Sequence, residues 1–327
     1  MTASLPDGVR APTALGWLMH QLSRPLLFAL GVLPLGLGLW MARRGADCAY
    51  ALGVRRRVLL ENLEYVLPEL SSNERRRVAR LSLRNIGQMA VESVASLRTR
   101  AKALDVMEIE NLPEIEELAR SGQGMILTLA HSGNMDLTGR AWVELGHEAN
   151  AVFKPPHSYY AFQFVQRLRA CNGYATLSTR DPEIRARMND VLARGATLVL
   201  LPDQNAHASG VHGTFLGRPV STFKGVAAAY LEQAKPPHVV VVVDTRPNDD
   251  RRHFCQTRIL KGPSLSGDRE ADVATVTQRI NDLFGEMVRK HPGSYFWGHH
   301  RWGRKLGDEW KISGSAPPNA VTSPTRE

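Results

Sequence analysis

A histidine and an aspartate five residues apart, His131 and Asp136, are the side chains in this sequence whose types and spacing best suit chemistry. They are preceded by an apolar run, 125–130, typical of a buried strand, and separated by a short polar segment, 132–134, typical of a turn. On one continuous helix they would point about 140° apart, so they meet only if the chain bends. A bend would let the carboxylate hold one imidazole nitrogen while the other takes a proton from a hydroxyl, as in general-base catalysis.

The spacing alone leaves another interpretation open. A histidine at the end of a strand, followed by an acid on the surface of a helix, would look the same, and the chain has 11 histidines and 32 acidic residues. We expect Asn134 to cap the helix that follows the turn, with Asp136 in its first turn. The surrounding sequence has to decide between the two interpretations.

The composition is that of a globular protein with an acidic partner. The chain has 327 residues, of which 43% are hydrophobic and 22% charged, with a net charge of +9. Such an excess indicates nucleic acid, anionic lipid or an acidic carrier protein, and the absence of any nucleic-acid-binding motif argues against the first. Three cysteines without metal-ligand spacing indicate a reducing compartment and argue against a disulfide framework or a zinc site.

The N-terminal region, residues 11–42, is the most apolar part of the chain. It contains eighteen consecutive uncharged residues, Pro25 to Ala42, which as a helix would reach about 27 Å, close to the thickness of a hydrocarbon core. The basic residues follow this run, which argues against a cleaved signal peptide. A buried helix of a soluble domain remains an alternative. We expect a membrane anchor or interfacial helix with its basic end on the cytoplasmic side.

The patterning predicts three regions: a membrane anchor or interfacial helix in 1–45, a folded domain in 46–307 and a disordered Ser/Pro/Gly-rich tail in 308–327. Residues 54–103 are predicted to form basic helices that contact anionic head groups or an acidic carrier. Beyond them, apolar runs alternate with helical patterns, which predicts an α/β fold with a mostly parallel sheet flanked by helices. The expected strands are 125–130, 150–153, 197–202 and 238–244, and the expected helices are 112–120, 137–146, 159–170, 182–194, 224–234 and 270–290.

Six patches occur in an order that resembles the bacterial lipid A biosynthesis (lauroyl/myristoyl) acyltransferases, within the wider glycerolipid acyltransferases with a His-x4-Asp/Glu motif. The resemblance extends from about residue 12 to 305. Met135 and Asp136 depart from the family's usual Trp and Glu, and aspartate is commoner in relatives acting on phosphatidylinositol mannosides or glycerolipids. The patches are Arg56–Leu63, Ala130–Asp136, Val152–Pro155, Leu201–Gln204, Thr214–Thr222 and Tyr295–Trp302.

The resemblance implies a membrane-bound enzyme with a glycerol-3-phosphate acyltransferase-like fold at the cytoplasmic face of the bacterial inner membrane. It would move a fatty acyl group from acyl carrier protein, or from acyl-CoA, to a hydroxyl of a glycolipid, foremost a lipid A precursor. A phosphatidylinositol mannoside or another glycerophospholipid is the alternative acceptor. The rival from another class is a non-catalytic protein that binds anionic lipid. No cofactor is expected. A metal at His299 and His300 is not favoured because no carboxylate or cysteine stands at ligand spacing.

The resemblance also implies roles for individual residues. His131 would be the general base and Asp136 its partner, while helix amides after the histidine would meet the developing oxyanion. A nucleophilic Ser132 is less favoured because the chain lacks the GxSxG elbow. The expected substrate-binding residues are Ser132, Gly133, Asn134, Lys154, Arg167, Arg169, Asp203, Gln204, Phe215, Gly217 and Arg218.

These substrate-binding residues divide by position. Arg167 and Arg169 would contact phosphate or carrier, unless they only form a solvated helix face. Asp203, at the end of a strand, would orient a basic residue or the sugar, unless it is a plain turn residue. The loop 215–218 would lie beside the acceptor's phosphate, and the residues Trp297, His299, His300, Arg301 and Trp302 would form an interfacial lip.

Overall fold

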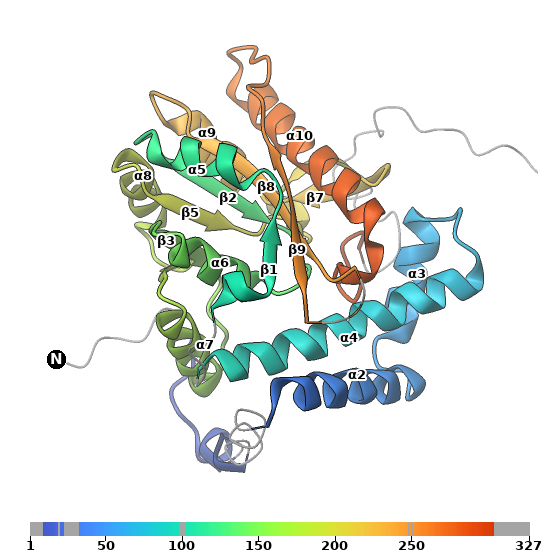
Figure 1. Cartoon of the computed structure of the whole chain (residues 1–327). Helices are drawn as coiled ribbons and strands as arrows, with labels where there is room; N and C mark the ends of the chain where they lie inside the picture. The colour runs from blue at the N-terminus through green and yellow to red at the C-terminus, as the bar shows by residue number, and fades with distance from the viewer. Residues whose placement is uncertain are drawn as a thin grey trace, which may run out of the picture.

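The structure is a computed structural model, and it describes residues 9–18, 20–22, 33–97, 102–247, 249 and 251–303. Its centre is a seven-stranded sheet (Figure 1). From one edge to the other the strands are β1 (Met107–Ile109), β9 (His253–Ile259), β8 (His238–Thr245), β2 (Met125–Leu129), β5 (Thr197–Leu200), β3 (Ala149–Phe153) and β4 (Ala175–Ser178).

Five strands of this sheet, β8, β2, β5, β3 and β4, run parallel to one another. β9 pairs antiparallel with β8, and β1 pairs parallel with β9. The mostly parallel sheet flanked by helices that the sequence predicts is therefore present. The carboxyl ends of its five parallel strands share one edge, which is where ligands gather in open α/β sheets.

Alternating side chains of the strands fill two cores, one on each face of the sheet. Val239, Val241 and Val243 of β8 pack with one group of helices, α3, α4, α8, α9 and α10, whereas Val240 and Val242 pack with α5 and α6. Successive side chains of this strand point to opposite faces of the sheet, and both faces are buried, which explains the continuous run of valine. The helices are α2 (Leu35–Ala51), α3 (Arg56–Val66), α4 (Ser72–Ser96), α5 (Leu112–Arg120), α6 (Met135–Glu144), α7 (Tyr159–Cys171), α8 (Ile184–Ala193), α9 (Gly225–Glu232) and α10 (Arg269–Lys290).

Local sequence sets where several helices begin. A capping box starts α4: the Ser71 hydroxyl accepts from the Glu74 amide, and the Glu74 carboxylate accepts from the Ser71 amide at 2.7 Å. Asn134 caps α6 as predicted, with its side chain accepting from the Leu137 amide at 3.1 Å. These bonds satisfy amides that a helix leaves without internal acceptors.

The predicted N-terminal membrane helix is wrong. Across the described ranges, no helix is both long and apolar enough to span a membrane. The physical reason is that α2 begins only after Pro34 and continues through Arg43 and Arg44, so charged residues occupy its middle. The expected boundary at 45–46 thus falls inside α2. Residues 1–8, 19, 23–32 and the predicted tail, 308–327, lie outside the described residues.

α2 lies along α4, beneath the sheet in the view of Figure 1. The two helices approach closely because glycines face the partner. A methyl group on Gly38 would lie 2.9 Å from Val91, and one on Gly87 would lie 3.2 Å from the carbonyl oxygen of Ala42. The helix pair therefore forms a rigid base below the carboxyl edge of the sheet.

Two further segments frame the site. The antiparallel hairpin of β6 (Val211–Phe215) and β7 (Arg218–Thr222) closes through Leu216 and Gly217, both with positive φ. The 3-10 turn η3 (Pro292–Ser294) follows α10, and the chain then runs along the turn after β2, where Phe296 donates its amide to the His131 carbonyl at 2.9 Å. Two more 3-10 turns are η1 (Ala103–Asp105) and η2 (His207–Ser209).

Candidate active site

His131 and Asp203 are brought together by the order of the strands. His131 follows β2 and Asp203 follows β5, and these strands are parallel neighbours, so their carboxyl ends meet. One Asp203 oxygen lies 2.6 Å from the imidazole Nδ1, and the other accepts the His131 backbone amide at 2.8 Å. The aspartate is 3% exposed, whereas the histidine side chain is 23% exposed. The imidazole is thus fixed at one nitrogen and partly open to solvent.

The two groups shift each other's pKa. Burial by itself lowers the pKa of His131, but the adjacent Asp203 carboxylate outweighs it and raises that pKa above its ordinary value. Burial likewise acts to raise the pKa of Asp203, and the imidazolium charge and hydrogen bonds of His131 hold it below its usual range. The guanidinium of Arg301 acts in the same direction on Asp203 and lowers the pKa of His131.

The predicted contact between His131 and Asp136 is replaced in the structure by the contact with Asp203. Asp136 lies in the first turn of α6, where its carboxylate accepts a hydrogen bond from the Tyr174 hydroxyl. The guanidinium of Arg169 lies 3.8 Å away from the same oxygen. The carboxylate in the His-x4-Asp motif is therefore engaged by residues of the neighbouring α7–β4 region.

The turn between the two motif residues is built from buried groups. Ser132 is 2% and Asn134 1% exposed. Gly133 has φ +53°, and a Cβ there would overlap the carboxylate of Asp244, so the position requires glycine. Asn134 donates its amide to Asp244 at 2.6 Å and its side chain to Glu92 at 2.9 Å. The Ser132 hydroxyl has no hydrogen-bond partner among the described residues.

A buried ionic cluster that no local sequence pattern indicated supports this turn. The Glu92 carboxylate accepts hydrogen bonds from both terminal nitrogens of Arg246, and the His253 Nδ1 lies 2.7 Å from a carboxylate oxygen of Asp244. The second His253 nitrogen lies 3.4 Å from Glu92. Burial opposes the charge of His253, yet the carboxylates of Asp244 and Glu92 raise the pKa of His253 to about 9. Burial acts to raise the pKa of Glu92, but His253 and Arg246 lower it to about 2. Asp244 and Arg246, charged residues ending a valine run, were the available signal.

Lys154 and Arg167 are exposed, and Arg169 is half-buried. Lys154 directly follows β3, at the carboxyl edge of the sheet. The Arg169 guanidinium lies over the ring of Phe153 at 4.6 Å, close to Asp136. The two arginines of α7 therefore differ: one is in the site's polar network, and the other faces solvent.

The expected acceptor loop 215–218 is a hairpin turn with a structural role. Phe215 is 2% exposed and packs against Tyr295 and Trp302. Arg218 donates to the Tyr65 carbonyl at 2.7 Å and so ties the hairpin to α3. Gly217, with φ +77°, supplies the turn conformation.

The predicted interfacial lip is also wrong, because most of it is core. Trp297, Trp302 and Arg301 are each at most 1% exposed. Arg301 donates hydrogen bonds to the carbonyl of Gln204 at 2.8 Å and to the carbonyl of Ser221. Gln204 itself is half-buried. These large side chains pack inward because they fill the space between the hairpin and α10.

His299 is the second imidazole of the site. Its Nε2 accepts the Asn205 amide at 3.1 Å. Burial lowers the pKa of His299 to about 4. The positive charges of Arg301 and His131 lower this pKa further, whereas the Asp203 carboxylate acts to raise it. His299 is consequently neutral at pH 7. Across the described residues, no group of histidine, cysteine and carboxylate side chains has the arrangement of a metal site.

Most of the chain matches a known family of enzymes. Residues 13–304 match the bacterial lipid A biosynthesis acyltransferases, and the chain belongs to that family. It is accordingly an acyltransferase, as the resemblance predicted.

Two relatives share most of their length with this chain. A lipid A biosynthesis palmitoleoyltransferase of Escherichia coli (strain K12) is 22% identical over 289 residues, which make up 88% of each protein. A lipid A biosynthesis acyltransferase of Shigella flexneri shows the same identity and the same coverage.

Proposed function

We propose that this acyltransferase moves a fatty acyl group from the thioester of acyl carrier protein, or of coenzyme A, to a hydroxyl of a lipid A precursor. The observation that carries the proposal is the partly open imidazole of His131, fixed through Nδ1 by Asp203. Family membership supplies the reaction class. The names of both relatives support lipid A biosynthesis as the setting.

In the proposed mechanism, His131 Nε2 takes the proton of the acceptor hydroxyl as its oxygen attacks the thioester carbonyl. The tetrahedral intermediate then expels the thiolate, which takes the proton back from the imidazolium. Asp203 keeps Nδ1 protonated and stabilises the imidazolium while it exists. The first free amides of α6, those of Met135 and Asp136, are proposed to meet the oxyanion.

The group of Asp136, Arg169 and Tyr174 is proposed to position the substrate beside this base. Arg169 is held against Asp136 and Phe153, so its charge has a fixed location. Lys154 and Arg167 add exposed positive charge nearby and suit contact with phosphate or with an acidic carrier. Aspartate at position 136, in place of the family's usual glutamate, keeps a mannosylated or other glycerophospholipid as the second candidate acceptor.

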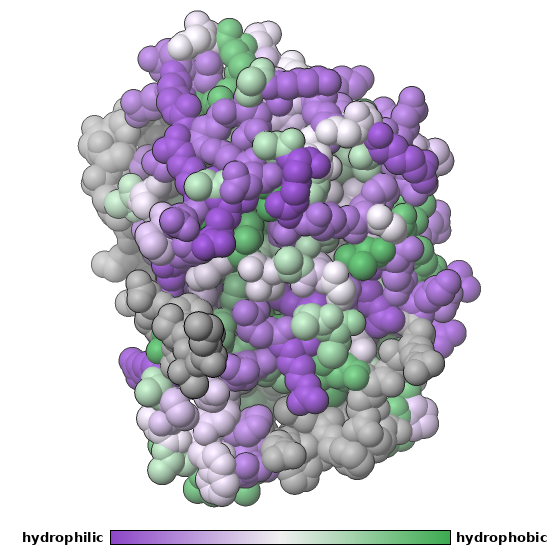
Figure 2. Space-filling view, turned by 90° about the vertical axis from the view of Figure 1, so that its left-hand side faces the viewer, coloured by the Kyte–Doolittle hydropathy of each residue, from purple (hydrophilic) through white to green (hydrophobic). Residues whose placement is uncertain are grey.

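Membrane association at the cytoplasmic face of the inner membrane is part of the proposal. Exposed apolar side chains support it: Trp17 is 54%, Trp40 49%, and Leu37 and Met41 each 44% exposed. Leu37, Trp40 and Met41 follow helical spacing on α2, as expected for one apolar face. The side of the molecule seen in Figure 2 is mostly hydrophilic, with apolar groups scattered over it from top to bottom.

The test is acyl transfer from labelled acyl carrier protein to a lipid A precursor by wild-type protein and two variants. His131→Ala is expected to lose at least about a thousandfold in kcat, because the base is absent. His238→Ala is the control, since that histidine starts β8 at the opposite edge of the sheet. Both variants are expected to sediment with membranes like wild type. Unchanged turnover in His131→Ala would refute the mechanism, and no transfer by wild type to the lipid A precursor would favour the second candidate acceptor.

A further inference from the structure

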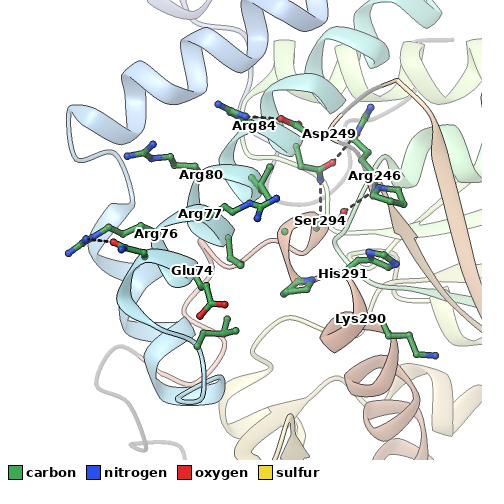
Figure 3. A pocket seen from close by; sticks show the side chains of 18 residues that line it. Glu74, Arg76, Arg77, Arg80, Arg84, Arg246, Asp249, Lys290, His291 and Ser294 are labelled. Atoms are coloured by element: carbon green, nitrogen blue, oxygen red, sulfur yellow. Dashed lines mark hydrogen bonds and ion pairs between the residues drawn. The ribbon is translucent and has the colours of Figure 1, made fainter.

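A basic cavity of about 980 Å³ lies between α4 and the segment that joins α10 to η3 (Figure 3). Six positively charged side chains line it, against the two carboxylates of Glu74 and Asp249. His131 is not among its lining residues, so this is not the site described above. The six are Arg76, Arg77, Arg80, Arg84, Arg246 and Lys290.

The carboxylates of this cavity are already occupied. The Glu74 carboxylate accepts hydrogen bonds from the hydroxyl and the amide of Ser71. The Asp249 carboxylate accepts hydrogen bonds from Arg84 and from the Gln88 side chain, both at 2.8 Å. Asp249 is therefore already paired with an arginine, and the six positive side chains outnumber the two carboxylates. Arg84 is further paired with Asp47 at 2.7 Å.

Part of the positive charge has no carboxylate to balance it. Within the described ranges, Arg77 has neither a hydrogen bond nor an ion pair. Arg80 lies over the ring of Tyr50 at 5.3 Å and forms no direct ion pair with any described carboxylate. Figure 3 shows Arg77 extending from α4 toward the wall of Arg246 and Ser294. A concave surface with low-dielectric walls strengthens the attraction of such charge for an anion.

The walls of the cavity are fixed before any ligand arrives. Gly293 packs so tightly that a Cβ would lie 2.9 Å from Leu81 of α4. The Asn85 side chain donates to the carbonyls of Gly133 and Ser294, both at 3.1 Å, and accepts Arg246 Nε at 3.0 Å. The cavity therefore shares its floor with the turn that carries His131, although it does not contain the imidazole.

We propose that this cavity binds a phosphate group carried by a lipid headgroup. Clustered guanidinium groups suit phosphate because they offer several charge-assisted hydrogen bonds to its oxygens. A volume of about 980 Å³ exceeds what one phosphate fills and admits a headgroup with a sugar. The assignment of the headgroup to the glycolipid acceptor rests on the proposed function, whereas the phosphate site itself does not.

Arg77→Gln with Lys290→Gln is the test variant, because both side chains line the cavity and neither belongs to the buried cluster. Arg75→Gln with Arg279→Gln is the matched control: it removes the same two charges from the same two helices outside the cavity. Binding of inorganic pyrophosphate, measured by calorimetry, does not require turnover. We expect Kd to rise at least tenfold in the test variant and to stay within twofold in the control. An unchanged Kd in the test variant, or equal weakening in both, would overturn the proposal.

Two further measurements identify the molecule that carries the phosphate. If it is the acceptor, the test variant raises KM about tenfold for the phosphorylated precursor, with kcat within threefold and no effect on a phosphatase-treated precursor. If it is a bilayer lipid, binding to vesicles with phosphatidylglycerol in phosphatidylcholine falls while KM is unchanged. No change in either would overturn the assignment to a lipid headgroup. Failure of acyl transfer by wild type alone would refute the proposed function and leave the pyrophosphate result standing.

Discussion

The molecule contains two histidine–aspartate pairs of nearly the same geometry in very different surroundings. The Nδ1 atom of His131 lies 2.6 Å from Asp203, and that of His253 lies 2.7 Å from Asp244. The His131 side chain is 23% exposed, whereas the His253 side chain is fully buried. Pairing with a carboxylate is therefore not what distinguishes a reactive histidine from a structural one.

The difference lies at the second ring nitrogen. His253 meets a carboxylate at each nitrogen, Asp244 and Glu92, so its imidazole is held as a cation and its pKa is raised to about 9. Among the described residues none hydrogen bonds to Nε2 of His131, which leaves that nitrogen available to a substrate proton. One pair is arranged for proton transfer and the other for rigidity.

The largest expected effect separates the pairs by activity. Asp203→Asn is expected to lower kcat by about 10²–10⁴-fold, because the imidazole loses the charge that stabilises its protonated form. His253→Gln is expected to change kcat of the folded protein less than about tenfold, because that ring is fully buried. Steady-state kinetics with circular dichroism as a folding check measures both. Similar losses in the two variants would erase the distinction.

For the free energy of unfolding, we expect changes in the buried cluster around His253 to have the larger effect. Arg246→Ala leaves the Glu92 carboxylate buried without its partner, and breaking a buried pair costs about 3–5 kcal/mol of unfolding free energy. Urea denaturation measures this loss. Arg57→Ala, which removes an exposed ion pair with Glu61, is the control and is expected to leave the midpoint unchanged. Equal midpoints for the two variants would contradict a structural role for the buried cluster.

A smaller effect on stability depends on pH. The pKa of His253 is about 9 in the folded protein and about 6.5 when unfolded, so its contribution is complete below pH 6.5 and is lost as pH rises through 9. The loss is on the order of 3 kcal/mol. Unfolding free energies measured between pH 6 and 9.5 are expected to fall, and the decline should be much weaker in His253→Gln. A decline of the same size in that variant would assign it to another group.

Local sequence predicted those parts of the fold that depend on local interactions. The strands near 125, 150, 197 and 238, the bounds of α5 and the cap Asn134 follow from periodicity and capping. The short strands β1, β4 and β9 were missed because three to seven mixed residues give no apolar run. The hairpin β6–β7 was taken for a loop for the same reason.

The contacts that define the site are non-local: Asp203 was expected to orient a basic residue or the sugar, but His131 was not named as its partner. Asp136 is five residues from His131 and was the obvious partner, but Asp203 reaches the imidazole from 72 residues away because β2 and β5 are neighbours. Spacing along the chain carries no information on strand order. The membrane helix was likewise inferred from an uncharged run, whereas Pro34 delays the start of α2 until Leu35.

The pH dependence of kcat in wild type, Asp203→Asn and Asp136→Asn tests the central claim most directly, namely that Asp203 is the carboxylate that sets the His131 base. Because the base must be neutral, kcat is expected to rise with pH through a pKa above about 6.5 in wild type. In Asp203→Asn that rise should move to lower pH, because burial and Arg301 then act unopposed. In Asp136→Asn it should stay in place, even where the rate is lower. A rise that moves in Asp136→Asn and stays in Asp203→Asn would contradict the account.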